Sequence, residues 1–213
     1  MTARRDAQGI CGPESRMAGV IEYRAATSGE LPTLAGYAAT FNMPAKIGGM
    51  FIEKIAPGAF RTSVIRDDVR ALFNHMPSFV LGRTTAGTLA LAEDAKGLAF
   101  EILPPDTNWA RDLITSVERG DVSSMSFQFL ARREEWDDSG DMPVRTLLEV
   151  ELVDISPVTF PAYDATSLLV KAPGTQQGRG ISASVVQFAN RTARERMRRE
   201  LGRRAGNLLA SLQ

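Results

Sequence analysis

A succession of short apolar segments joined by turn-forming residues constrains the fold of this chain most strongly. Four such segments follow one another closely, at 69–75, 79–84, 88–93 and 97–103. The joints between them contain Pro, Gly or Asp, which end or reverse strands. Strands joined so closely pair with their neighbours in antiparallel order. The pattern therefore predicts a mainly antiparallel sheet, and we expect the strand at 69–75 to end at Pro77, which has no N–H for the ladder.

Two helices are expected beside the strands. The first opens at Pro57 and runs toward Ile65, since proline suits the first turn of a helix. The second begins at Asp106 or Thr107, either of which can cap it, and ends where Gly120 follows. The fold class predicted from these elements is α+β, mainly β, with a few packed helices.

The chain is expected to hold one folded domain with appendages. Its hydrophobic content of 44% supplies a sizeable core. Polar and small residues at 1–16 predict a flexible leader, and the domain itself is expected over 17–172, with order beginning near Met17. Residues 173–186 have the composition of a linker, and 187–213 form a basic, helix-prone tail.

Composition excludes several classes of function. Cys11 is the only cysteine, so no disulfide within the chain and no cysteine-based metal site is expected. No apolar run is long enough to cross a membrane. The sequence also lacks the glycine-rich phosphate loop that a nucleotide hydrolase would need. The formal net charge is +0. Seven arginines lie between Arg191 and Arg204, but Glu195 and Glu200 interleave with them and favour a solvated helix over nucleic-acid binding.

A strand after Gly120 carries the first candidate for chemistry. Side chains alternate along a strand, so Met125 and Phe127 share one face with Ser123, while Ser124 and Ser126 share the other. The face of Met125 belongs to the core, which disfavours Ser123 as a reactive hydroxyl. Alternation alone leaves Ser124 and Ser126 open.

A serine hydroxyl needs a base, and His75 is the only histidine. A carboxylate that orients the imidazole would complete the set, and the strand at 145–155, expected to form a hairpin with the serine strand, contains three. Glu151 is best explained as a solvated residue. Asp154 lies on the opposite strand face from Glu149 and Glu151 unless a bulge intervenes.

Five ordered motifs carry a resemblance to a known family. They are Phe51–Phe60, Leu72–His75, Asp106–Leu113, Gly120–Phe127, and Glu149 with Ser156–Tyr163. Their order and spacing over roughly residues 18–170 resemble the prohead proteases of tailed bacteriophages. The resemblance implies a fold similar to the herpesvirus assemblin proteases, a closed or nearly closed antiparallel sheet or barrel.

The resemblance also implies a function and its residues. It identifies a serine endopeptidase inside the immature capsid, in the cytoplasm of the bacterial host, that cleaves the major capsid protein or its scaffold segment and also itself, without a cofactor. His75 corresponds to the general base, Ser126 to the nucleophile and Glu149 to the acidic third member. Whether the chain forms a homo-oligomer stays open. The alternative is a non-catalytic capsid assembly or scaffolding protein that retains the protease fold.

Overall fold

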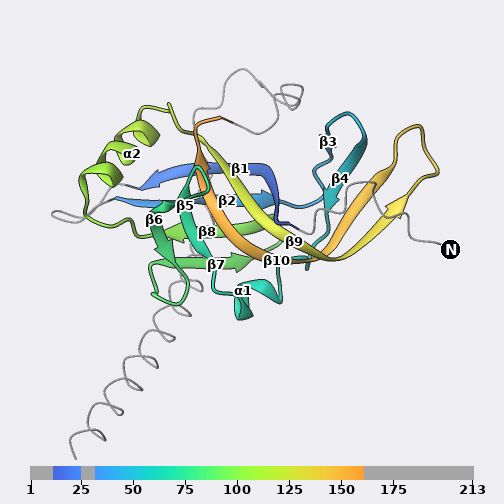
Figure 1. Cartoon of the computed structure of the whole chain (residues 1–213), viewed down its shortest axis with the longest axis horizontal. Helices are drawn as coiled ribbons and strands as arrows, with labels where there is room; N and C mark the ends of the chain where they lie inside the picture. The colour runs from blue at the N-terminus through green and yellow to red at the C-terminus, as the bar shows by residue number, and fades with distance from the viewer. Residues whose placement is uncertain (1–11, 25–31, 161–213) are drawn as a thin grey trace, which may run out of the picture.

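A computed structural model of the chain describes residues 12–24 and 32–160. Within these residues the protein is mainly β, with two helices and a ten-stranded sheet (Figure 1). The strands are β1 (Glu14–Arg24), β2 (Thr33–Thr40), β3 (Ala45–Ile47), β4 (Phe51–Ile55), β5 (Arg70–Phe73), β6 (Met76–Arg83), β7 (Leu89–Glu93), β8 (Gly97–Ile102), β9 (Ser124–Asp137) and β10 (Val144–Val158). The helices are α1 (Ser63–Arg66) and α2 (Asn108–Glu118).

Strand β10 is the point at which the sheet branches. Its hairpin with β9 is antiparallel, as predicted, and the two long strands curve side by side across the molecule (Figure 1). On its other edge β10 runs parallel to β4 at one end and to β5 at the other. The sheet is therefore mixed, because β4 and β5 approach β10 after crossover connections rather than through hairpins.

The expected closed or nearly closed antiparallel barrel is not supported. The strand order is β3-β4-β10-β9-β1-β2-β8-β7, and within the described residues β7 pairs with β8 alone. The hairpin of β5 and β6 leaves the main path at β10 instead of joining β7 to the other end of the sheet. Within the described residues the sheet therefore does not close into a barrel, and β3 and β7 are its end strands.

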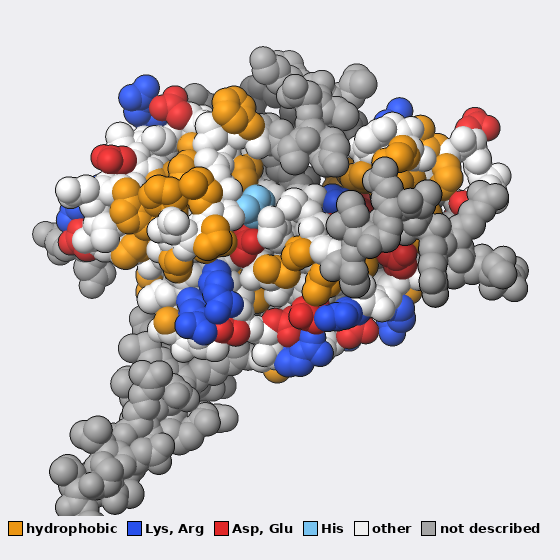
Figure 2. All heavy atoms as spheres, in the orientation of Figure 1, with side chains coloured by type: hydrophobic (Ala, Val, Ile, Leu, Met, Phe, Trp, Pro, Cys, Tyr) orange, Lys and Arg blue, Asp and Glu red, His pale blue; other side chains and the backbone are white. Residues whose placement is uncertain are grey.

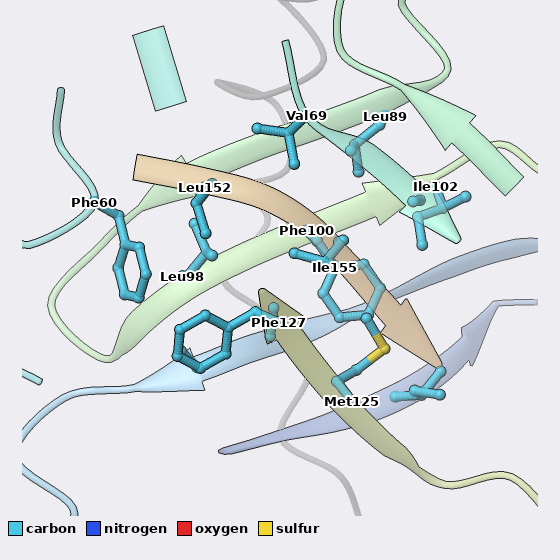
Figure 3. Packing of buried hydrophobic residues seen from close by; sticks show 14 of the residues in the cluster. Phe60, Val69, Leu89, Leu98, Phe100, Ile102, Met125, Phe127, Leu152 and Ile155 are labelled. Atoms are coloured by element: carbon cyan, nitrogen blue, oxygen red, sulfur yellow. The ribbon is translucent and has the colours of Figure 1, made fainter. Parts of the chain in front are cut away.

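The core confirms the alternation predicted for the serine strand. Met125, Phe127 and Phe129 of β9 are fully buried, and the Phe60 ring meets Phe127 edge-on with centroids 5.7 Å apart (Figure 3). Ile155 of β10 lies opposite Phe127 and is also fully buried. Burying each of these side chains stabilises the fold by about 1.5–3 kcal/mol relative to exposure. The face of β9 that bears Met125 is thus held inward.

Helix α2 delivers the chain into β9 through the predicted glycine. Gly120 has a φ of 81°, and the N–H groups of Gly120 and Asp121 donate to the carbonyls of Val117 and Ser116. This is the Schellman arrangement, for which a glycine with positive φ is best suited. Leu113, Ile114 and Val117 are buried, so the apolar stripe of the helix packs on the core.

Some predicted boundaries differ from those observed. Strand β1 begins at Glu14, before the Met17 at which order was expected to begin. The first eleven residues of the expected leader lie outside the described residues, as do the linker at 173–186 and the helix-prone tail at 187–213. Of the helices in the described part of the chain, none is long and apolar enough to cross a membrane.

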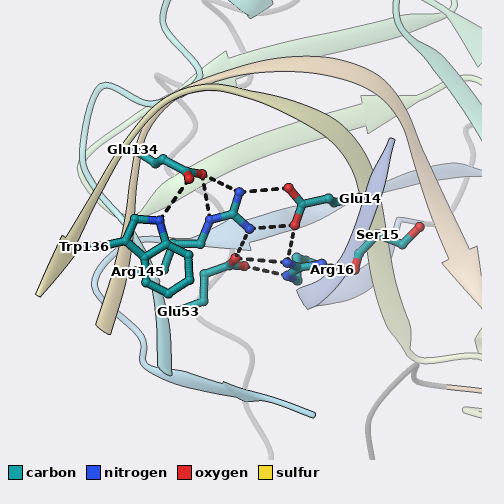
Figure 4. Close-up of polar contacts among 7 residues, drawn as sticks. All are labelled: Glu14, Ser15, Arg16, Glu53, Glu134, Trp136 and Arg145. Atoms are coloured by element: carbon teal, nitrogen blue, oxygen red, sulfur yellow. Dashed lines mark hydrogen bonds and ion pairs between the residues drawn. The ribbon is translucent and has the colours of Figure 1, made fainter. Parts of the chain in front are cut away.

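A cluster of buried and partly buried charges joins β1, β4, β9 and β10 (Figure 4). Arg145 of β10 bonds to Glu14 of β1 and Glu134 of β9, and its Nη1 lies 3.0 Å from Glu53 Oε2 of β4. The Nε of Arg16 lies 2.5 Å from Glu53 Oε1. Because Glu53 is only 3% exposed, its carboxylate depends on these two guanidinium groups for compensation.

The cluster also changes the ionisation of its members. Burial acts to raise the pKa of Glu14, but the hydrogen bonds and charges of Arg145 and Arg16 outweigh it and leave the pKa lowered from its ordinary value of 4.5. For Arg145 burial acts to lower the pKa, and the bonds to Glu14 and Glu134 outweigh it, so the pKa is raised. The folded state therefore favours the charged forms of both groups.

Replacing Arg145 by Leu should lower the free energy of unfolding by about 3–5 kcal/mol, because Glu14 and Glu53 then keep only Arg16 as a cation and Glu134 loses its ion pair with Arg145. Urea unfolding followed by circular dichroism measures the change. The control is Arg83→Leu, which breaks an exposed pair with Asp68 and should change stability little. Equal losses in the two variants would contradict the role given to the cluster.

Acid should weaken the wild-type protein through Glu14. Its lowered pKa in the folded state contributes stability above pH 4.5, its ordinary pKa, and this contribution is lost as the pH falls through the folded-state value. Unfolding free energies measured at several pH values should therefore fall less steeply with acidification in Glu14→Gln than in the wild type. The same slope in both proteins would mean that Glu14 has no lowered pKa.

Candidate active site

His75 lies on a two-residue turn between β5 and β6. Phe73 and Met76 pair across the turn, and the two residues between them, Asn74 and His75, have φ angles of 52° and 56°. Hairpins of this length favour turns in which both central residues have positive φ. A positive φ is uncommon for residues other than glycine and costs free energy, although asparagine and histidine adopt it more often than most. The surrounding structure must therefore hold His75 in place.

Hydrogen bonds to the end of β10 fix this turn. The Asn74 N–H donates to the Pro157 carbonyl over 3.0 Å. The Asn74 side-chain amide donates to Thr159 Oγ1 over 3.1 Å, and its oxygen accepts from the Thr159 N–H over 2.9 Å. The expectation that this segment would continue as a strand to His75 and end at Pro77 was wrong, because the chain reverses at Asn74 and Pro77 lies within β6.

Ser126 contacts the histidine from β9, which lies on the other side of β10 from β5. It lies on the β9 face opposite to Phe127, and its Oγ is 2.7 Å from His75 Nε2. The residue is only 3% exposed, so the hydroxyl is held among protein groups rather than in bulk water. Of the two serines that alternation left open, Ser126 is the one for which the structure gives a bond to the imidazole.

The carboxylate that orients His75 is that of Asp154. His75 Nδ1 lies 2.7 Å from Asp154 Oδ1, and the side chain of Asp154 is 4% exposed. Glu149, predicted for this place, instead lies with its carboxylate 4.0 Å from Arg133 Nη1 and with 36% of its side chain exposed. The structure thus brings together two of the three predicted residues, His75 and Ser126, and places Asp154 where Glu149 was expected.

A bulge in β10 explains the difference. Leu152 pairs with Phe129, and Asp154 pairs with Gln128, the residue adjacent to Phe129 on β9. Val153 is therefore an extra residue on β10. An extra residue reverses the alternation that follows it. Asp154 therefore leaves the core face to which Leu152 points and shares the opposite face with Ser126. The sequence shows the acidic residue, but it gives no sign of the bulge.

The contacts define which atoms carry protons. An ionised carboxylate only accepts hydrogen bonds, so Nδ1 of His75 must donate to Asp154. In a neutral imidazole the other nitrogen then has a free lone pair, and Nε2 accepts the hydrogen bond from the Ser126 hydroxyl. The line of groups can thus remove a proton from Ser126 Oγ and stabilise the imidazolium that results.

The site opens at the surface. The histidine side chain, 18% exposed, is visible among apolar groups in the space-filling view (Figure 2). Met76, the next residue along the chain and the first of β6, is 46% exposed, so apolar surface adjoins the turn that carries the histidine. No three His, Cys, Asp or Glu side chains gather as metal ligands anywhere in the part of the chain that the structure describes.

A comparison with known protein families agrees with the resemblance found in the motifs. A protein-family model described as "Caudovirus prohead serine protease" matches residues 20–179. Among solved structures, the bacteriophage T4 capsid assembly protease, gp21, is 10% identical, with 70% of this chain and 98% of that chain covered and a TM-score of 0.47. No curated protein matches the chain. The family model alone therefore carries the assignment.

Asp154→Asn should slow the reaction of Ser126 with a fluorophosphonate probe by roughly 100-fold or more, because an amide can present its N–H to Nδ1 and favour the wrong tautomer. The rate of probe attachment, followed by mass spectrometry of the intact chain, measures the loss. Glu149→Gln is the matched control and should react at the wild-type rate. A slow Glu149→Gln with a fast Asp154→Asn would restore Glu149 as the orienting group.

Proposed function

The chain belongs to the caudovirus prohead serine protease family, and on that premise we propose that it is a serine endopeptidase whose catalytic residues are Ser126, His75 and Asp154. The observation that carries the proposal is the hydrogen-bonded line from Asp154 through His75 to Ser126, with 2.7 Å at each step. A nucleophile, a base and an orienting carboxylate in this order form the arrangement that activates a serine hydroxyl. The alternative of a non-catalytic assembly protein has no observation of its own in its favour.

The first half of the reaction forms an acyl-enzyme. Ser126 Oγ attacks the carbonyl carbon of the scissile peptide bond while its proton passes to His75 Nε2. The imidazolium is stabilised by the carboxylate of Asp154, which stays ionised. The tetrahedral intermediate then collapses, the C–N bond breaks, and His75 returns the proton to the departing amine.

The second half regenerates the enzyme. A water molecule takes the place of the amine and loses a proton to His75 Nε2 as its oxygen bonds to the acyl carbon. The bond from that carbon to Ser126 Oγ breaks, and the proton returns to Oγ. The new carboxyl terminus leaves, and no group other than water is consumed.

The substrates we propose are the major capsid protein, through its scaffold segment, or a separate scaffold protein, together with the enzyme's own chain. Family membership supports a role in prohead maturation. We place the activity inside the immature capsid in the host cytoplasm, where scaffold removal would be needed. Within the described residues β6, which begins directly after His75, pairs with β5 alone, and an unpaired strand edge is suited to an extended polypeptide rather than to a small polar substrate.

Co-expression with the major capsid protein of the same genome tests this function. The wild-type enzyme should shorten the capsid or scaffold chain, and Ser126→Ala should leave it whole, as shown by intact-mass measurement. Ser124→Ala removes a hydroxyl from the same face of β9, two residues away, and should still cleave. Processing by Ser126→Ala at the wild-type rate would exclude Ser126 as the nucleophile.

A further inference from the structure

We propose that Ser156 is a positioning residue that fixes both the carboxylate and the histidine of the candidate active site, an inference that rests on the proposed function. Ser156 is fully buried and lies directly opposite Ser126 in the pairing of β9 with β10. Its Oγ donates to Asp154 Oδ1 over 2.8 Å and accepts from the His75 N–H over 3.2 Å. One hydroxyl thus bonds to two members of the triad at once.

The chemistry of the groups sets the direction of each bond. The Asp154 carboxylate can only accept, so the single proton of the Ser156 hydroxyl points toward Asp154. The lone pairs of Oγ are then free for the backbone N–H of His75. Asp154 Oδ1 receives both this hydroxyl and His75 Nδ1, which together hold the carboxylate in one orientation.

The histidine needs such a support because of its backbone. His75 has a φ of 56°, a conformation that persists only where neighbouring groups impose it. Asn74 is tied to Pro157 and Thr159, while the bond to Ser156 holds the N–H of His75 itself. Without the hydroxyl, that N–H and the buried carboxylate each lose a partner, and the position of Nε2 relative to Ser126 is less well defined.

Ser63 provides a matched comparison within the same chain. It is also fully buried, its Oγ accepts from the Leu152 N–H over 2.8 Å, and it donates to the Asp67 carboxylate. The connections repeat those of Ser156, with a backbone N–H on one side and an aspartate on the other. The difference is that Asp67 bonds to Arg66 and not to the histidine.

The test is the reaction of the full chain with a fluorophosphonate, analysed as a maximal rate of inactivation and a dissociation constant. Ser156→Ala should lower the maximal rate about 10- to 100-fold and leave the dissociation constant unchanged, since one charge-assisted hydrogen bond is lost. Ser63→Ala should stay within about two-fold of the wild type in both constants. If Ser156→Ala behaves as Ser63→Ala does, the inference is overturned.

A double-mutant cycle separates positioning from general loosening. Most of the effect of Ser156 is argued to run through its charge-assisted bond to Asp154, and the longer bond to the His75 N–H is a neutral one. Ser156→Ala should therefore cost little further rate, about two-fold or less, when Asp154 is already Asn. A full 10- to 100-fold loss in that background would show that Ser156 does not work through Asp154, and would overturn the proposal.

Further variants distinguish three outcomes: a Ser156→Ala protein that does not fold, a failure of the proposed function, and a failure of the inference about Ser156 alone. If circular dichroism shows that Ser156→Ala does not fold, Ser156→Cys takes its place, because a thiol keeps the volume of the side chain but is a much weaker hydrogen-bond donor. Ser156→Cys should also react slowly with the probe. A wild-type rate for Ser156→Cys would overturn the inference. If Ser126→Ala is labelled by the fluorophosphonate as fast as the wild type, the label is on another residue and the proposed function fails. If Ser126→Ala is inert and Ser156→Ala is fully active, only the inference about Ser156 fails.

Discussion

The pairing of β10 with β9 is the interaction on which the rest of the structure depends. Along most of its length this pairing places apolar side chains inward, with Leu152 opposite Phe129 and Ile155 opposite Phe127. Between these pairs the strand carries one extra residue, Val153, and the extra residue turns Asp154 away from the core. A single irregularity thus makes the same strand serve the core on one side and the candidate active site on the other.

The other edge of β10 brings in the histidine. Strand β5 runs parallel to β10, with Asp154 paired to Arg70, so the end of β5 arrives beside the last residues of β10. A reversal of the chain at Asn74 and His75 then becomes fastened to Ser156, Pro157 and Thr159 by backbone and side-chain hydrogen bonds. The pairing of β5 with β10, at which the sheet branches, therefore also brings His75 next to Ser126. The charge cluster of Arg145, Glu53 and their neighbours lies at the opposite end of β10 and secures the strand there.

Local patterns in the sequence predicted much of this arrangement. Alternation identified Met125 and Phe127 as core residues and kept Ser126 as a candidate, because the β9 strand is regular over that stretch. The resemblance placed the acidic partner at Glu149, and alternation kept Asp154 off the face of Glu149 and Glu151 unless a bulge intervened. The structure has a bulge at Val153 and brings Asp154 to His75. A bulge depends on how two strands pair and has no signature in the residues of either one. The closed barrel failed for a related reason, because strand segments in a sequence indicate neighbours along the chain but not the parallel pairing of β10 with β4 and β5. Ser156 lies in the motif Ser156–Tyr163, but nothing in the sequence indicates a role for it, and the proposal for Ser156 rests on its two hydrogen bonds.

In the proposed mechanism, Asp154 holds the imidazole of His75 with the proton on Nδ1, leaving Nε2 to accept from Ser126. Because the chain has one histidine, nitrogen-15 labelling of histidine gives a single pair of ring signals that report the tautomer directly. At a pH where the ring is neutral, we expect a protonated Nδ1 in the wild type and in Glu149→Gln. In Asp154→Asn we expect the proton on Nε2 instead. A wild-type ring protonated at Nε2, or a tautomer that changes with Glu149 and not with Asp154, would contradict this mechanism.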